Sequence, residues 1–273
     1  MSEGYPDLSK LYHDYFTRHL ATKKSRDIPA ETRHIMQLLG RVIDLSSSRD
    51  FAVLGCGPQP ETIVELANLG HRITGLEPIK SYVETANDYL QGKATVVEGV
   101  AESLPLADES QDVVFFESVL EHVDSPKRCL SEIYRVLRPG GILYLTTTNR
   151  LNFQISGKNG EYRTPYFNWF PKLVKESYVH HHLHYRPEHA NFSSRPAVHW
   201  FSFTDLCQLG RESEFAIFYS MLDLHRPEDH PGSGFTAKIK RSIINLLNTS
   251  PWFRAAVLTQ RGYAIVMLKR PID

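Results

Sequence analysis

The sequence contains little cysteine and no long apolar run. Its three cysteines, Cys56, Cys129 and Cys207, are odd in number and widely spaced. This excludes a disulfide framework or a cysteine-based zinc site and indicates a reducing compartment. No apolar run approaches the roughly 18 residues of a transmembrane helix. The first residues also lack the basic-then-apolar pattern of a signal peptide. We therefore expect a cytoplasmic protein.

An excess of charge of either sign is missing as well. The chain has 31 Lys and Arg against 31 Asp and Glu, so its formal net charge is zero. A neutral chain argues against broad nucleic-acid binding, which depends on neutralising phosphates. With 273 residues, 41% of them hydrophobic, the chain suits one large domain or a core domain with an insertion.

The first half of the chain has a regular alternation of short apolar runs with amphipathic segments. The predicted strands are 51–54, 72–76, 94–98, 112–116 and 142–147. Helices are predicted at 61–69, 81–90 and from Ser125 and Pro126 onward, with two more at 8–20 and 30–45. This rhythm predicts a doubly wound α/β sheet.

The second half is less regular. Residues 150–200 are rich in aromatic residues, proline and histidine and have no clear period. A helix at 204–211, a strand at 215–222, a helix at 236–259 and a final strand at 263–268 are then predicted. We expect the last two strands to form an antiparallel pair with residues 236–259 inserted between them.

The turn in "FAVLGCGPQP", residues 51–60, is typical of a nucleotide site. Gly55 and Gly57 let the backbone approach a ligand closely, and Glu77 ends the next strand, where a carboxylate can accept both ribose hydroxyls. These features alone suit NAD and S-adenosylmethionine equally. Pro58 and Pro60 remove two N–H donors that a pyrophosphate would use, which favours S-adenosylmethionine over a dinucleotide.

Three longer stretches carry a family resemblance. "VLGCGPQPETIVELANLGHRITGLEP", "VVEGVAESLPLADESQDVVFFESVLEHV" and "EIYRVLRPGGILYLTTTNR" resemble the class I S-adenosylmethionine-dependent methyltransferases. The closest likeness is to the small-molecule branch, with its ubiquinone-pathway and polysaccharide- or lipid-modifying enzymes. The resemblance covers roughly residues 45–150 and returns at "HWFSFTDL" and in the last strand.

The resemblance implies a Rossmann-like sheet of seven strands with an antiparallel last strand and an inserted lid. It divides the chain into N-terminal helices over the cofactor site (1–45), the cofactor-binding core (46–150), a substrate lid (151–200) and the rest of the core (201–273). The lid would be a substrate-capping insertion rather than a separate module, because about fifty residues rarely form a stable core of their own.

The resemblance also implies cofactor-binding residues. They are Gly55, Cys56, Gly57, Gln59, Glu77, Ala101, Glu102, Glu117 and Ser118. The glycine turn would pass under the methionine part of S-adenosylmethionine, and Glu77 would hold the ribose diol. Ala101 and Glu102 would lie at the adenine edge, and Glu117 and Ser118 near the transfer site.

The turn departs from the family in its acids. The residue two before the first glycine, usually acidic, is Val53; the third glycine is replaced by Gln59; and a further acid expected near Val100 is absent. Another group must hold the methionine ammonium, and Glu117 is a candidate.

The implied function is methyl transfer from S-adenosylmethionine to a small molecule, with a hydroxyl oxygen favoured as acceptor. A hydroxyl must lose its proton, and His122, His181 and His199 are the candidate bases, among which the sequence does not choose. Metal binding at Glu117, Glu121 and His122, or in "VHHHLHYRPEH", is disfavoured by spacing. A non-catalytic S-adenosylmethionine-binding protein is the alternative.

The segment 236–259 places Lys238, Lys240 and Arg241 beside apolar residues at helical spacing. This pattern favours a helix packed on its own core or on a second copy over one lying on a membrane surface. We therefore expect a monomer or homodimer whose partner is a small-molecule methyl acceptor.

Overall fold

The computed structural model describes residues 27–150, 162, 164–183, 186, 197–260 and 263–270. The helix predicted at 8–20 lies outside these residues, as does most of the segment between 151 and 196.

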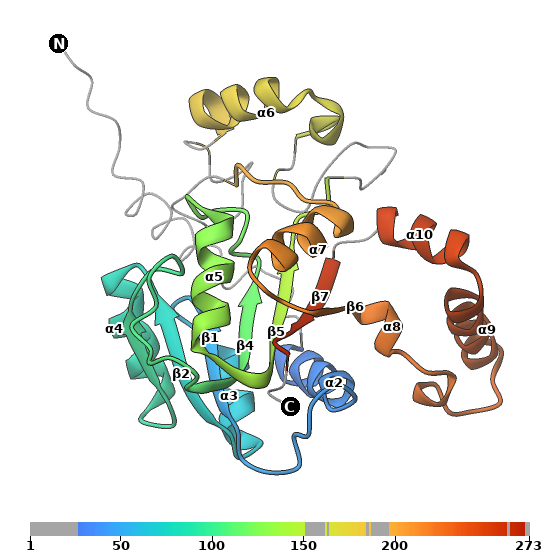
Figure 1. The fold of residues 1–273 in the computed structure, drawn as a ribbon, viewed down its shortest axis with the longest axis horizontal. Helices are drawn as coiled ribbons and strands as arrows, with labels where there is room; N and C mark the ends of the chain where they lie inside the picture. Colours follow the sequence, from blue (N-terminus) through green and yellow to red (C-terminus); the bar gives the residue numbers. More distant parts are fainter. Residues whose placement is uncertain are drawn as a thin grey trace.

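A seven-stranded sheet in the order β3-β2-β1-β4-β5-β7-β6 forms the centre of the fold. Its strands are β1 (Asp50–Leu54), β2 (Arg72–Glu77), β3 (Thr95–Glu98), β4 (Gln111–Glu117), β5 (Leu137–Thr147), β6 (Ile217–Ser220) and β7 (Tyr263–Leu268). The first five strands run parallel, whereas β7 is antiparallel to both of its neighbours. The predicted doubly wound sheet with an antiparallel last strand is confirmed (Figure 1).

Helices cover both faces of this sheet. The residues buried on one face come from α2 (Ile28–Leu39), α3 (Glu61–Asn68) and α4 (Lys80–Leu90). On the other face they come from α5 (Pro126–Val136) and α7 (Phe203–Glu212). The sheet is therefore the middle layer of three, as its apolar strands require.

The alternation of side chains along β1 explains why its sequence is apolar throughout. Phe51 and Val53 belong to the core cluster under α2 and α3, whereas Ala52 and Leu54 belong to the cluster under α5 and α7. Successive residues of a strand point to opposite faces, and both faces are covered here. Val53 is thus a core residue of the first strand, at the position where the family has an acid.

The predicted start of α5 is confirmed. The Ser125 hydroxyl accepts a hydrogen bond from the Arg128 N–H, and Pro126 occupies the first turn, where its missing N–H is not needed. By contrast, Pro60 is the N-cap of α3 and has no capping side chain. The helix that follows the glycine turn therefore starts without a polar cap, as its two prolines predict.

The described part of the predicted lid buries a small cluster of side chains. It contains the turn η2 (Phe167–Trp169), helix α6 (Lys172–Tyr178) and the π-helical turn η3 (Val179–Leu183). A small cluster is buried among them: Tyr162, Phe167, Val179, Leu183 and Ala197. The Tyr162 hydroxyl donates to the Ala197 carbonyl at 3.1 Å, which ties the segment to the chain that returns toward α7.

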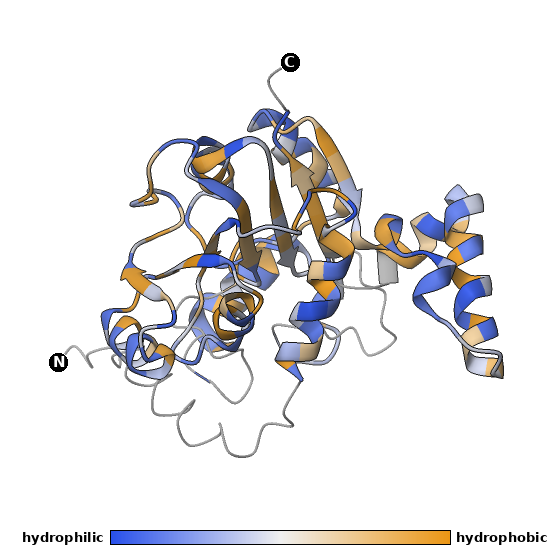
Figure 2. Ribbon diagram, turned by 90° about the horizontal axis from the view of Figure 1, so that it is seen from below, coloured by the Kyte–Doolittle hydropathy of each residue, from blue (hydrophilic) through white to orange (hydrophobic). Residues whose placement is uncertain are grey.

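The predicted helix at 236–259 is wrong as a single element. It is two helices, α9 (Phe235–Thr249) and α10 (Pro251–Gln260). Pro251 cannot donate the backbone hydrogen bond that a continuous helix needs, and it disfavours helical geometry in the residue before it. Figure 2 shows the two helices standing beside the layered core.

Two other predicted elements are too long. The strand predicted at 215–222 covers only β6, because Ser220 and Asp223 form a capping box that begins the short helix α8 (Met221–Leu224). The helix predicted at 30–45 ends at Leu39.

The turn η4 (Pro227–Asp229) lies between α8 and α9. Within the described residues, we find no helix long and apolar enough to cross a bilayer.

Candidate functional site

The glycine turn lies at the carboxyl end of β1, between the sheet and α3. Gly55 and Gly57 have positive φ angles of 68° and 69°, a conformation that side chains disfavour. The Gly55 N–H donates to the Leu76 carbonyl at 2.7 Å, so the turn is bonded to β2. A Cβ on Gly57 would meet no atom within 4 Å, which leaves open space on that side of the turn.

Glu77 ends β2 directly beside this turn. Its side chain is buried, and its carboxylate accepts hydrogen bonds from the N–H groups of Gly57 at 3.0 Å and Ile79 at 3.2 Å. Burial raises the pKa of Glu77 above its ordinary value, while the two N–H donors act in the opposite direction. Glu77 therefore both shapes the glycine turn and presents a carboxyl group at the strand edge.

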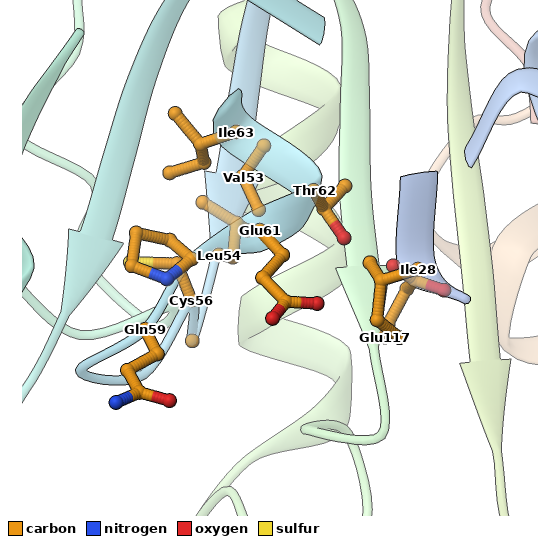
Figure 3. Close-up of a pocket in the computed structure, with 11 residues that line it drawn as sticks. Ile28, Val53, Leu54, Cys56, Gln59, Glu61, Thr62, Ile63 and Glu117 are labelled. Carbon is orange, nitrogen blue, oxygen red and sulfur yellow. The ribbon is translucent and has the colours of Figure 1, made fainter. Parts of the chain in front are cut away.

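A cleft of about 220 Å³ opens between the turn, α3 and the end of β4. Its lining residues are Ile28, Val53, Leu54, Gly55, Cys56, Gln59, Pro60, Glu61, Thr62, Ile63 and Glu117. Figure 3 shows the carboxyl group of Glu61 in the middle of this lining, between Gln59 and Glu117. The cleft thus carries two carboxyl groups, although Val53 itself supplies none.

Sequence reasoning missed several of the lining residues, among them Ile28, Glu61 and Thr62. Ile28 begins α2 and reaches the cleft from a segment that precedes the sheet in sequence. Glu61 and Thr62 start α3. Their position after the turn was a usable signal, because the first turn of a helix that follows a strand faces the ligand edge of the sheet.

The residues at the end of β4 adopt a constrained geometry. Glu117 is half-buried and lines the cleft. Ser118 has a positive φ of 54°, and its N–H donates to the Thr146 carbonyl at 2.9 Å. That bond holds the β4 end against β5, so the chain turns away sharply after Glu117.

Ala101 and Glu102 lie in the segment after β3. Ala101 packs against the core cluster under α5. The Glu102 carboxylate accepts hydrogen bonds from the N–H groups of Asp124 at 2.8 Å and Ser125 at 3.4 Å. Glu102 therefore joins the loop after β3 to the start of α5, a contact that the sequence did not predict.

Of the three candidate histidines, His122 and His199 are brought together. The backbone carbonyl of Glu121 accepts hydrogen bonds from the N–H groups of Val198 and His199, so the two chain segments run side by side. The buried Glu121 carboxylate accepts the Thr147 hydroxyl at 2.8 Å and links the same segment to the end of β5. His181 lies elsewhere, exposed on η3, with its Nδ1 2.8 Å from the Ser177 carbonyl oxygen.

His199 has a defined tautomer. Its Nε2 lies 2.9 Å from the Val123 carbonyl oxygen, which can only accept, so Nε2 carries the proton. In the neutral ring this leaves the lone pair on Nδ1. Burial lowers the pKa of His199 below the ordinary 6.5, although the bond to Val123 opposes this shift. His199 is therefore neutral at physiological pH.

Cys56, which lines the cleft, is a thiol rather than a thiolate. Burial raises the pKa of Cys56 to about 12, and the charge of Glu77 adds to this shift. Among the described residues, no three His, Cys, Asp or Glu side chains are grouped so that they could hold a metal ion.

Comparison with known proteins identifies the fold and the domain. Residues 53–145 match the methyltransferase domain family. An S-adenosylmethionine-dependent methyltransferase of Thermotoga maritima superposes with a TM-score of 0.53 at 19% identity, covering 96% of this chain and 98% of that one. The chain therefore has the fold of S-adenosylmethionine-dependent methyltransferases, and residues 53–145 match a methyltransferase domain.

Curated proteins support the same family. The thiol S-methyltransferase TMT1B of Homo sapiens is 33% identical over 145 residues, which cover 50% of this chain and 58% of that protein. The ubiquinone biosynthesis O-methyltransferase of Maricaulis maris is 29% identical over 170 residues, which cover 58% and 64%. The matches thus span less than two thirds of these relatives' lengths. Residues 53–145 of this chain thus match the methyltransferase domain, and these similar curated proteins are methyltransferases.

S-adenosyl-L-methionine is the methyl donor of this family. The chemistry of the described site fits it. The open side of Gly57 leaves room for a ligand against the backbone, and the carboxyl groups of Glu61, Glu77 and Glu117 suit hydroxyl and ammonium groups. A pyrophosphate would instead meet the negative charges of these carboxylates.

Proposed function

We propose that this protein transfers a methyl group from S-adenosylmethionine to a small molecule, with a hydroxyl oxygen as the favoured acceptor. The observation that carries the proposal is the arrangement of the glycine turn. Glu77 is held at the end of β2 by the Gly57 N–H, next to a cleft that opens toward Glu117 at the end of β4.

The proposed cofactor contacts follow from this arrangement. The ribose hydroxyls would donate to Glu77, and the methionine part would lie against Gly55 and Gly57. In the family an acid stands at the position of Val53. Glu117 and Glu61 would bind the methionine ammonium in its place, because both line the same cleft as Val53. Sulfonium and ammonium are cationic, so two carboxylates in one cleft favour this ligand over an anionic one.

We assign His199 as the general base for a hydroxyl acceptor. Its proton is fixed on Nε2 by the Val123 carbonyl, so Nδ1 carries the lone pair, and its lowered pKa keeps the ring neutral at pH 7. His122, on the neighbouring segment, would then line the substrate mouth. His181 is 2.8 Å from its own helix's Ser177 carbonyl and is the weakest of the three candidates.

The segment 151–200 would cap the acceptor. It leaves the sheet directly after β5, and its described part forms an aromatic cluster that returns beside Glu121 through Val198 and His199. An aromatic cap of this kind excludes water and suits an aromatic or amphiphilic acceptor. Methyl transfer itself needs mainly alignment of the acceptor oxygen with the methyl group and sulfur.

A methyl-transfer assay tests the function. The full chain is incubated with S-adenosylmethionine labelled on its methyl group and a panel of phenols, sugars, thiols and lipid precursors. We expect label in a hydroxyl-bearing acceptor and loss of most of that rate in His199→Gln, with little change in the matched variant His181→Gln. Cofactor binding without transfer to any acceptor would favour a non-catalytic binding protein.

A further inference from the structure

Helix α9 exposes an apolar stripe. Phe235, Ile239, Ile243 and Leu246 recur at spacings of four, four and three residues, so they share one face of the helix. Phe235 is 80% exposed and the other three are 42–44% exposed. Ile244 and Leu247, on the opposite side, are buried. The helix therefore packs on its own protein with one side only, and a second apolar side is left in solvent.

Helix α10, which follows α9, also exposes a large aromatic side chain. Trp252 follows the break at Pro251 and is 88% exposed, the most exposed of the large apolar residues in the described chain. Tryptophan is enriched where proteins meet the boundary between lipid and water, because one part of its ring is apolar and the indole N–H is polar. We call Phe235, Ile239, Ile243, Leu246 and Trp252 the apolar stripe.

The charged residues of α9 and α10 all have one sign. From 235 to 260 the sequence contains Lys238, Lys240, Arg241 and Arg254 and no aspartate or glutamate. Helical geometry places Lys238 and Lys240 on the two flanks of the stripe. Within the part of the chain that the structure describes, neither lysine takes part in an ion pair.

The two arginines do form polar contacts, because they bond to the chain that leads into α9. Arg241 donates to the carbonyls of His230 at 2.8 Å and Gly232 at 2.7 Å. Arg254 forms two bonds of 2.7 Å with the Asp223 carboxylate. The helix pair is thus fixed in place through its inner side, and the apolar stripe with its two lysines faces outward.

The helices leave the sheet at the edge that carries the site. Strand β6 ends at Ser220, level with Leu145 of β5, and β7 begins opposite Thr147. These positions lie at the end of the sheet where β1, β2 and β4 also finish. The Asn149 side chain also donates to the Leu258 carbonyl at 3.1 Å, which joins α10 to the residues that follow β5.

We propose that the apolar stripe, flanked by Lys238 and Lys240, docks the protein on the surface of an anionic lipid bilayer. An apolar helix face of this width inserts into the headgroup region, lysines on its flanks reach the phosphates, and tryptophan anchors the boundary. The one-sided charge decides for lipid over a second copy of the chain, because two such faces would bring four lysines together without an acid between them.

The sequence pattern favoured packing on protein for this segment. The buried Ile244 and Leu247 satisfy that expectation on one side, but the exposure of the apolar stripe shows a second side with a different role. Docking through this surface does not depend on methyl transfer, so it can be tested whether or not an acceptor is known.

A vesicle flotation assay with the full chain tests the proposal. One set of vesicles is phosphatidylcholine alone, and the other contains about 30% phosphatidylserine to mimic an anionic leaflet. We expect flotation with the anionic vesicles at about 0.05 M salt and much less at about 0.5 M, since salt screens surface charges. Lys238→Gln should weaken binding about fivefold, and adding Lys240→Gln should weaken it about fivefold again.

Two variants distinguish vesicle binding through the apolar stripe from non-specific binding through any exposed apolar residue. Trp252→Ser combined with Ile239→Ser should abolish flotation, whereas Leu173→Ser should not, although Leu173 is 79% exposed on α6. Circular dichroism checks that each variant is folded. Absence of flotation with anionic vesicles overturns the proposal, and so does flotation that survives the stripe variant. A dimer in sedimentation equilibrium that the stripe variant dissociates, without vesicle binding, would assign this face to a second copy instead.

Discussion

Alanine substitutions at Gly55 and Gly57 separate two effects of an added methyl group: the backbone cost of a positive φ and the clash with neighbouring atoms. Both glycines have nearly the same positive φ, 68° and 69°, so alanine meets the same backbone penalty at either position. The surroundings differ. A Cβ on Gly55 would lie 2.5 Å from Cγ2 of Val119, whereas a Cβ on Gly57 would meet nothing within 4 Å. The difference in stability between the two variants therefore removes the backbone cost and leaves the cost of the clash with Val119.

The magnitudes follow from these surroundings. Left-handed geometry costs an L residue roughly 1–2 kcal/mol, and the loss of unfolded-state entropy returns about 0.4–1 kcal/mol, so Gly57→Ala should lower the free energy of unfolding by at most about 1.5 kcal/mol. Gly55→Ala adds an overpacking cost of about 1–3 kcal/mol. We therefore expect Gly55→Ala to be less stable than Gly57→Ala by about 1–3 kcal/mol.

Urea unfolding of the two variants and of Gly55→Ala with Val119→Ala provides the test. Removing the Val119 methyl groups should relieve most of the clash. This relief appears as a coupling energy of about 1–2 kcal/mol in the double-mutant cycle. Gly57→Ala should instead weaken binding of S-adenosylhomocysteine at least about tenfold, because its methyl group enters the open side of the turn. Equal stabilities of the two single variants and no coupling to Val119 would refute this reasoning.

Two further predictions concern the cofactor and the base. Glu77→Ala should weaken S-adenosylhomocysteine binding by about ten- to a hundredfold, as calorimetry measures. It should also lower the free energy of unfolding by about 1–3 kcal/mol, because two N–H groups lose their acceptor, as urea unfolding measures. Glu84→Ala, at an exposed position, is the control. A general base works only when deprotonated, and burial lowers the pKa of His199. The midpoint of the fall in transfer rate toward acid pH should therefore lie below 6.5, the ordinary histidine pKa. A midpoint above 6.5 would count against His199.

The parallel half of the fold could be predicted because its signals are local. Short apolar runs that are buried on both faces, as in β1 and β4, can be recognised without knowing their neighbours. The start of α5 was equally clear, since Ser125 and Pro126 act on the adjacent backbone alone. The antiparallel β7 followed from the resemblance to a known family.

The parts that could not be predicted depend on contacts between distant residues. The break between α9 and α10 had a local signal in Pro251, but the helical periodicity around it concealed the break. Nothing in the sequence indicated that Glu102 caps the loop before α5, or that Ile28 reaches the cleft. The apolar periodicity of α9 was visible in the sequence, but only the exposed fractions of the side chains show which face of the helix lies in solvent.

The central claim is that the cleft beside the glycine turn holds S-adenosylmethionine, and calorimetric titration of the full chain tests it most directly. S-adenosylmethionine, S-adenosylhomocysteine and NAD are titrated in turn. We predict binding of the first two at one molecule per chain, lost or strongly weakened in Glu77→Ala, and no binding of NAD. Binding of NAD in place of S-adenosylhomocysteine, or S-adenosylhomocysteine binding that Glu77→Ala leaves unchanged, would contradict the account.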